Sequence, residues 1–230
     1  ATVAVNDRTM DAAMATVDEL RQLGVASEAF VGDVGRPGDA SRLVAQVQAR
    51  FGSLDILVNN AGIRGRNTVD HITDEEWEHI VDVNLSAPFF TSRAALPQMR
   101  RRGFGRIINV SSLAGVLATA VSGAAYTATK TGLLGLTRHV AIEAAADGIT
   151  VNAIMPGYTH VPFMDANFSA EALAAIAQTI PALKLGSIAC LGAIAAFLAS
   201  PAAGYITGTA VMADGGLSLI PGDYSAVRAT

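Results

Sequence analysis

The sequence predicts an α/β fold: a doubly wound, Rossmann-like parallel sheet with helices on both faces, giving three layers. Strand-like apolar runs alternate with stretches of helical periodicity along the whole chain. The run at residues 106–110 is largely apolar on consecutive positions, as expected for a sheet covered on both faces. Because 51% of the 230 residues are hydrophobic, the chain can bury one core, and we expect a single domain over residues 1–230.

The first part of the chain predicts three strands and two helices. Strand-like segments lie at residues 2–5, 29–31 and 54–58. Apolar residues recur at helical spacing between them, and each predicted helix is followed by a glycine, Gly24 or Gly52, that can end it in a left-handed conformation. This order predicts parallel strands joined by right-handed helical crossovers.

The middle of the chain predicts a long helix, a strand, a second helix and another strand. Thr73 and Glu76 form a capping-box pattern, so a helix should begin there and run towards Gly103, with a kink or break at Pro88 or Pro97. The strand at 106–110 follows, then a helix over 126–146 and a strand over 149–155.

The last part of the chain predicts a substrate loop. Pro156 and Gly157 open a long irregular segment, and we expect residues 157–187 to form a loop or lid. Its portion at 158–180 contains Phe163, Met164 and Phe168, which suggests a partly apolar pocket wall. Helical stretches at 170–180 and 188–199 precede a short final strand at 210–212.

Composition excludes several classes of function. The formal charge is −4 and the longest basic run is Arg100-Arg101-Arg102, so we expect no nucleic-acid partner. The longest apolar run, residues 188–199, is too short to span a bilayer and fits a buried helix. Cys190 is the only cysteine; we expect it to be buried without a role, in a reducing cytoplasm, and we assign no metal ligand.

Tyr126 and Lys130 are the strongest candidates for catalysis. They lie four residues apart on a predicted helix, so both side chains project from one face. A free phenol is a poor base at neutral pH, but a neighbouring ammonium stabilises the phenolate and suits it to acid/base work. The alternative is an ordinary solvated helix surface, where the same spacing arises by chance.

Other polar residues follow predicted strands, where a doubly wound sheet binds its ligands. Ser111 and Ser112 follow the strand at 106–110, and Ser112 could bond a substrate carbonyl oxygen; the alternative is a turn that ends the strand. Asn59-Asn60-Ala61-Gly62 could let the backbone approach a ligand, or be an ordinary turn. Asn84 is disfavoured inside a helix, so it should make specific hydrogen bonds, either functional or within the core.

These motifs, in this order and at these intervals, closely resemble the short-chain dehydrogenase/reductase family over essentially the whole chain. The pieces that match are Asn59-Asn60-Ala61-Gly62, Val83-Asn84-Leu85, Ser111-Ser112, Tyr126 with Lys130, Pro156-Gly157, Asp33-Val34, Val151-Asn152-Ala153, Gly204-Tyr205-Ile206-Thr207-Gly208 and Asp214-Gly215-Gly216. The resemblance implies an oxidoreductase that moves a hydride between a nicotinamide cofactor and an alcohol or carbonyl. It also implies a homo-oligomer, frequently a tetramer.

The resemblance implies four catalytic residues. Tyr126 would donate or remove the hydroxyl proton, and Lys130 would assist it while holding the nicotinamide ribose. Ser112 would orient the substrate oxygen, and is preferred to Ser111 because Ser-Leu-Ala-Gly matches the family's Ser-x-x-Gly. Asn84 would support a water-linked proton path behind Lys130.

The resemblance also implies a cofactor site. Asn60, Ala61 and Gly62 would line the cofactor, Asp33 and Val34 would border the adenine, and Pro156 and Gly157 would lie near the nicotinamide. Val161 stands where the family often has a threonine, and Thr159 is close enough to compensate.

The preference for NAD or NADP depends on the residues that follow the first predicted strand, at residues 2–5. Asp7 would accept hydrogen bonds from ribose hydroxyls and repel a 2′-phosphate, which favours NAD, whereas Arg8 could pair with that phosphate and keeps NADP open. The alternative is that Asp7 is only a turn residue.

The sequence departs from the family pattern at its N-terminal end and just before the helix predicted at residues 188–199. The family begins with a strand and a Gly-rich turn that holds the pyrophosphate, whereas this sequence begins in what should be the second strand. We therefore expect a strand to be missing from the middle of the sheet, either because a preceding segment lies outside this sequence or because the chain is truncated. The run Ser187-Ile188-Ala189-Cys190 lacks the acidic residues that usually open its helix.

Two functions remain open at this point. One is an active NAD-dependent oxidoreductase acting on a small molecule. The other is a catalytically silent family member that senses cofactor or assists assembly. Keto acids, sugars, 3-oxoacyl thioesters and steroids are all possible substrates. Arg64 and Arg66 could meet a substrate carboxylate, or could be solvated loop residues.

Overall fold

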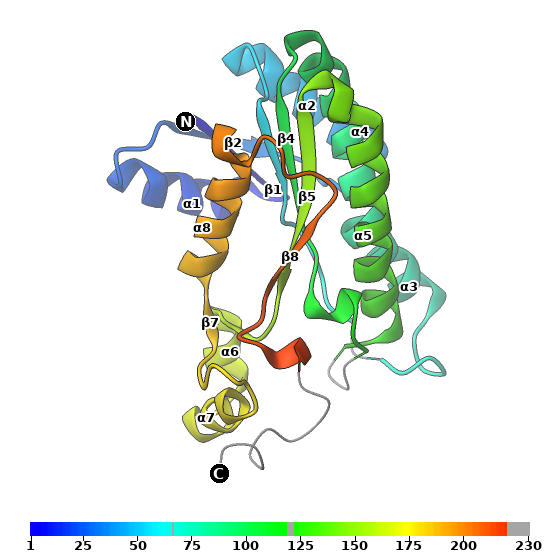
Figure 1. The fold of residues 1–230 in the computed structure, drawn as a ribbon, viewed down its shortest axis with the longest axis vertical. Coiled ribbons are helices and arrows are strands. Elements are labelled where there is room, and N and C mark those ends of the chain that lie inside the picture. Colours follow the sequence, from blue (N-terminus) through cyan, green and yellow to red (C-terminus); the bar gives the residue numbers. More distant parts are fainter. Residues whose placement is uncertain (66, 119–121, 220–230) are drawn as a thin grey trace.

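The protein is described by a computed structural model, in which residues 1–65, 67–118 and 122–219 are placed; the side chain of Phe163 lies outside that description. Parallel strands form the centre and helices cover both faces, so the predicted doubly wound α/β fold is confirmed (Figure 1). The principal strands are β1 (Val3–Asp7), β2 (Ser27–Val31), β3 (Ile56–Asn59), β4 (Gly105–Val110), β5 (Ile149–Pro156) and β8 (Ala210–Ala213).

The helices alternate with these strands as expected. They are α1 (Met10–Gln22), α2 (Pro37–Phe51), α3 (Asp74–Val81), α4 (Ala87–Arg102), α5 (Ala124–Ala144), α6 (Pro162–Asn167), α7 (Ala170–Gln178) and α8 (Ile188–Ala199). Helices α1 and α8 lie on one face, and α2, α4 and α5 lie on the other (Figure 1). Gly24 and Gly52 follow α1 and α2 with φ of 74° and 80°, the left-handed conformation predicted for them.

The sheet is divided into two parts. Strands β3, β4, β5 and β8 form one parallel sheet in that order, while β1 and β2 form a separate parallel pair. The facing edges of β1 and β3 have no strand partner among the described residues, and a cavity of about 760 Å³ lined by both strands lies between them. The division falls where we expected a strand to be missing, and it leaves Ile56 and Val58 exposed.

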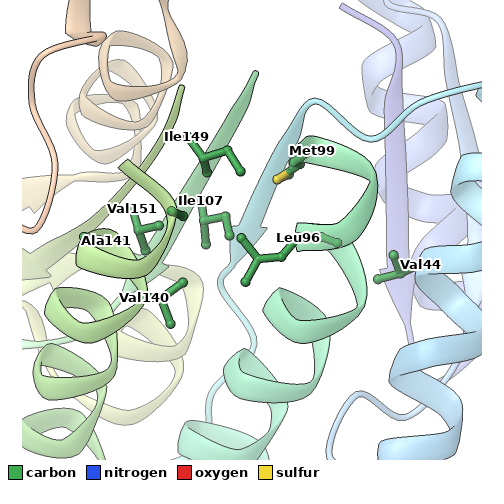
Figure 2. Close-up of a cluster of buried hydrophobic side chains, with 10 residues drawn as sticks. Val44, Leu96, Met99, Ile107, Val140, Ala141, Ile149 and Val151 are labelled. Carbon is green, nitrogen blue, oxygen red and sulfur yellow. The ribbon is translucent and has the colours of Figure 1, made fainter. Parts of the chain in front are cut away.

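The main core lies between the four-stranded sheet and the helices α4 and α5. Ile107, Ile149 and Val151 project from neighbouring strands towards Leu96 and Val140 of these helices (Figure 2). These side chains are almost completely buried, so the strongest apolar packing holds β4 and β5 against α5. Nearer the carboxyl end of β5, Ala153 and Met155 are buried against Leu134 of α5, so this end of the strand is also packed against the helix.

The predicted long helix is interrupted, but not at its prolines. Residues Asp82–Ser86 form a turn of π-helix between α3 and α4, whereas Pro88 lies in the first turn of α4 and Pro97 lies inside α4 without ending it. Proline is tolerated in a first turn because its missing N–H has no helical partner there. The helix is irregular as predicted, but neither proline ends it: the irregularity contains Asn84 and stops two residues before Pro88.

The segment at residues 157–187 is more regular than predicted. It contains α6, α7 and the short parallel pair β6 (Thr159–His160) and β7 (Gly186–Ser187). Ser187 caps α8 by accepting a hydrogen bond from the Cys190 amide at 3.2 Å, and so supplies the acceptor that an acidic residue would have given.

Helix α8 is only half-buried, contrary to expectation. One stripe, which includes Leu191, Ile194 and Leu198, packs on the sheet, and the rest of the apolar surface faces outward. Cys190 lies on this outer side and is exposed, so the expectation that it is buried was wrong. The periodicity of α8 is too weak to show which face is covered, because nearly every position is apolar. Within the described ranges, no helix combines the length and apolar character needed to cross a membrane.

Candidate active site

Tyr126 and Lys130 lie together at the start of α5, as the sequence predicts. Tyr126 is in the first turn of the helix, and the Lys130 Nζ lies 5.7 Å from the centre of the Tyr126 ring. The ring is half-buried, whereas Lys130 is 3% exposed. The pair is therefore a half-buried phenol with a buried ammonium beside its ring, and neither residue is among those that line the small cavity described below.

The buried environment of Lys130 disfavours the charged form of its side chain. Burial lowers the pKa of the Lys130 ammonium to about 8. Its Nζ donates to the Val110 carbonyl at 2.8 Å, and no described carboxylate forms an ion pair with it. An ammonium has three N–H donors, so this buried group keeps donors for the hydroxyls of a ligand.

Asn84 fixes the loop that follows β3. Its side-chain oxygen accepts from the Ile63 amide at 2.8 Å, and its amide nitrogen donates to the Ile63 carbonyl at 2.9 Å and to the Thr129 hydroxyl at 3.3 Å. The residue is completely buried, and the π-helical turn places it there. These contacts join the loop to α5 next to Lys130.

Ser111 and Ser112 have different surroundings. The buried Ser111 hydroxyl donates to the Lys130 carbonyl at 2.9 Å, which ties the end of β4 to α5. The Ser112 oxygen accepts from the Ala114 amide at 3.1 Å and borders a small cavity. Its hydroxyl hydrogen is thus free to point towards a ligand, as the preference for Ser112 requires.

The small cavity has a volume of about 70 Å³ and lies over the ends of β4 and β5. Its lining residues are Arg64, Ser112, Leu113, Ala114, Ser122, Pro156, Gly157, Tyr158 and Leu217. Arg64 is the only charged residue among them, and its guanidinium carbon lies 5.8 Å from the centre of the Tyr126 ring. Arg66, which we considered beside Arg64, lies outside the described residues.

The other residues expected to line the cofactor come together only in part. Asp7, Val34, Asn60 and Ala61 line the larger cavity between β1 and β3. Arg8 is exposed beyond the end of β1 and does not line that cavity. Asp33 is used locally: its carboxylate accepts from the Gly35 amide at 3.1 Å and pairs with Arg36 at 3.6 Å.

The residues present fit the two ends of a nicotinamide dinucleotide. At the nicotinamide end, a Cβ on Gly62 would lie 3.3 Å from the Lys130 Nζ and 3.4 Å from the Asn84 side-chain oxygen, so glycine leaves this approach open. At the adenine end, Asp7 stands at the carboxyl end of β1, where a ribose is bound in this architecture. No Gly-rich strand–turn–helix for the pyrophosphate occurs in the part of the chain that is described.

The residues after β5 are held by the end of β8. The Gly157 amide donates to the Ala213 carbonyl at 3.0 Å, and a Cβ on Gly157 would lie 2.8 Å from the Asp214 Cα. Glycine is therefore required for this close approach. Thr159 is half-buried in β6, and its hydroxyl donates to the Gly157 carbonyl at 3.4 Å.

Two supporting features were missed from the sequence. The Asn59 side-chain amide donates a buried hydrogen bond of 2.8 Å to the Asn109 side-chain oxygen and so joins β3 to β4, and the hydroxyls of Thr91 and Thr137 extend this network to α4 and α5. Amides inside otherwise apolar strands were the signal that could have revealed it. The second feature is a backbone hydrogen bond of 2.8 Å from the Gly123 amide to the Gly65 carbonyl. It joins two loops that are distant in the sequence, so no local sequence pattern predicts it.

A Rossmann-like sheet with a tyrosine, a buried lysine, a serine and an asparagine at one edge defines the class of nicotinamide-dependent oxidoreductases. The sequence profile of the family described as Enoyl-(Acyl carrier protein) reductase matches residues 1–218. The chain belongs to the short-chain dehydrogenase/reductase family, whose members transfer a hydride between NAD or NADP and an alcohol or carbonyl.

Individual relatives support this assignment. The 3-oxoacyl-(acyl-carrier-protein) reductase FabG of Staphylococcus aureus is 39% identical over 216 residues, which is 94% of this chain and 87% of the relative. The D-beta-hydroxybutyrate dehydrogenase of Rhizobium meliloti is 37% identical, covering 80% of this chain and 75% of the relative. The crystal structure of a gluconate 5-dehydrogenase from Burkholderia cenocepacia, in complex with NADP and tartrate, superposes with a TM-score of 0.88 at 32% identity, covering 96% of this chain and 86% of that one.

Proposed function

We propose that the protein interconverts a small-molecule alcohol and its carbonyl compound, with Tyr126 as the general acid/base. The bound nicotinamide supplies the acceptor or donor of the hydride. Tyr126 takes the proton from the substrate hydroxyl during oxidation and returns it during reduction. The observation that carries this proposal is the buried, unneutralised ammonium of Lys130 beneath the Tyr126 ring, because it favours the phenolate.

The other site residues have supporting parts in this proposal. Ser112 donates its hydroxyl hydrogen to the substrate oxygen, and Lys130 bonds the nicotinamide ribose with its remaining N–H groups. Asn84 holds the Ile63 backbone and keeps the loop after β3 in place for the cofactor. A silent cofactor-sensing or assembly subunit, the other function we considered, would have no use for the Tyr126 and Ser112 hydroxyls.

We further propose that residues 157–187 form the substrate lid of a single domain covering residues 1–230. Tyr158, near the start of the segment, borders the small cavity, and the β6–β7 pair closes the segment on itself.

We also propose assembly with further copies of the chain in the cytoplasm, as a tetramer. The exposed apolar side chains of Ile188 and Phe197 on α8 support such a contact, and light scattering measures the resulting mass.

We propose NAD as the preferred cofactor, because Asp7 can bond the adenosine ribose hydroxyls and would repel a 2′-phosphate. Arg8 keeps NADP open, and the gluconate 5-dehydrogenase structure was determined with NADP. The test is a fluorescence titration with NADH and with NADPH, on the native protein and on Asp7→Ala.

NADH should bind more tightly than NADPH, and Asp7→Ala should reduce the difference by about tenfold, or about 1.4 kcal/mol. Tighter NADPH binding by the native protein would overturn the NAD preference alone. Failure of both nucleotides to bind would overturn the proposed function.

A further inference from the structure

We infer that Arg64 is a specificity residue that binds the carboxylate of the substrate, so that the natural substrate is a small hydroxy acid or keto acid. The inference rests on the proposed function and names the substrate class for the same site. It is motivated by the position of the guanidinium, which lines the small cavity and lies against the Tyr126 ring.

The described lining of the small cavity carries positive charge and no negative charge. Arg64 is the only charged residue in its lining, and none of the ion pairs within the described ranges includes Arg64. Lys130 adds a second positive charge beneath Tyr126. The nearby Asp214 carboxylate already accepts from the Gly216 and Ser218 amides at 2.9 and 2.8 Å, so a cavity lined by one arginine without a described ion-pair partner favours an anionic ligand over a neutral one.

The backbone on both sides of Arg64 is fixed. Asn84 bonds both the amide and the carbonyl of Ile63, and the Gly123 amide donates to the Gly65 carbonyl at 2.8 Å. A solvated loop arginine needs no such support. Here the residue before Arg64 is tied to the π-helical turn and the residue after it to the start of α5, which also carries Tyr126.

Arg64 lines the same cavity as Ser112 and lies beside the Tyr126 ring, so one substrate can reach all three side chains. A substrate whose reacting oxygen lies on Tyr126 and Ser112 would place a carboxylate a few bonds away against Arg64. The planar guanidinium can bind a carboxylate through two parallel hydrogen bonds, which orients the carbinol carbon as well as binding the acid. The cavity of about 70 Å³ is small, which suits a short acid better than a long acyl chain.

The test compares an acid with its neutral ester. The substrates are 3-hydroxybutyrate, malate and gluconate, together with the methyl esters of the first two. Each is assayed with the oxidised nucleotide. The native protein should oxidise at least one acid with kcat/KM about tenfold or more above that of its ester. Arg64→Leu should lower kcat/KM for the acid by about 10- to 100-fold, mainly through KM, and change the ester less than threefold.

Two further variants make the result specific. Arg64→Lys keeps the charge but loses the paired hydrogen bonds, and should lie between the native protein and Arg64→Leu. Arg138→Leu removes an exposed arginine elsewhere on α5 and should leave kcat/KM unchanged for both the acid and the ester. An equal effect of Arg64→Leu on acid and ester, or a native protein with no preference for any acid, would overturn the inference. Turnover that survives in these proteins but is lost in Tyr126→Phe would leave the proposed function standing.

Discussion

A buried ammonium without a neutralising carboxylate is costly for a folded protein, and Lys130 is such a group. Its pKa falls from 10.5 to about 8 because burial disfavours the charged form. A difference of this size corresponds to about 3 kcal/mol of lost stability. The cost is fully present below pH 8, declines as the pH rises from 8 to 10.5, and is gone above that range, because the unfolded chain then also loses the proton. The proposed role of Lys130 beside Tyr126 gives a reason for this cost.

Lys130→Met should therefore stabilise the nucleotide-free protein at pH 7, by about 1–2 kcal/mol once the lost bond to the Val110 carbonyl is allowed for. The gain should shrink at pH 10. Urea unfolding at the two pH values measures it. The same variant should show activity only at higher pH, since the Tyr126 phenolate loses its neighbouring cation. A variant that is less stable than the native protein at pH 7 would contradict this account of Lys130.

At the scale of elements, strands were predictable and irregular turns were not. The apolar runs placed β4, β5 and α8 almost correctly. Burial of the sheet on both faces requires such runs in β4 and β5, whereas α8 is apolar all round but only half-buried. The Thr73 cap was also predictable: its hydroxyl accepts from the Glu76 amide at 3.2 Å, although Glu76 itself bonds Asn67. The π-helical turn carrying Asn84 was not predictable, because its stability comes from contacts with Ile63 and Thr129 that are distant in sequence.

Gly123→Ala tests the joint between α5 and the Arg64 loop. A Cβ there would lie 2.7 Å from the Gly65 carbonyl oxygen, which is backbone and cannot move aside cheaply. We expect a loss of about 1–3 kcal/mol in stability and a higher KM for an acid substrate. Gly135→Ala is the matched control in the same helix, where a Cβ meets nothing within 4 Å; it should be neutral or stabilising by about 0.5–1 kcal/mol. Equal thermal unfolding of the two variants would refute the proposed role of Gly123.

At the scale of the whole molecule, the order of motifs along the chain predicted both the architecture and the place of the site. The carboxyl ends of parallel strands meet at one edge, so Ser112, just after β4, and Pro156, at the end of β5, had to lie near each other, and both line the small cavity. The division between β1 and β3 was expected from the family's strand order, but the cavity between them and the exposure of Ile56 and Val58 required the structure. The outward apolar face of α8 also required it, because an all-apolar helix does not show which side packs.

The central claim is that Tyr126 transfers the proton in a nicotinamide-dependent reaction. Its most direct test is the turnover of Tyr126→Phe, measured by nucleotide absorbance with the best acid substrate, beside a titration of the same variant with NADH. We predict that the nucleotide still binds and that kcat falls by about 10²- to 10⁴-fold, since only the hydroxyl is removed. Turnover equal to that of the native protein, with nucleotide binding intact, would contradict the claim.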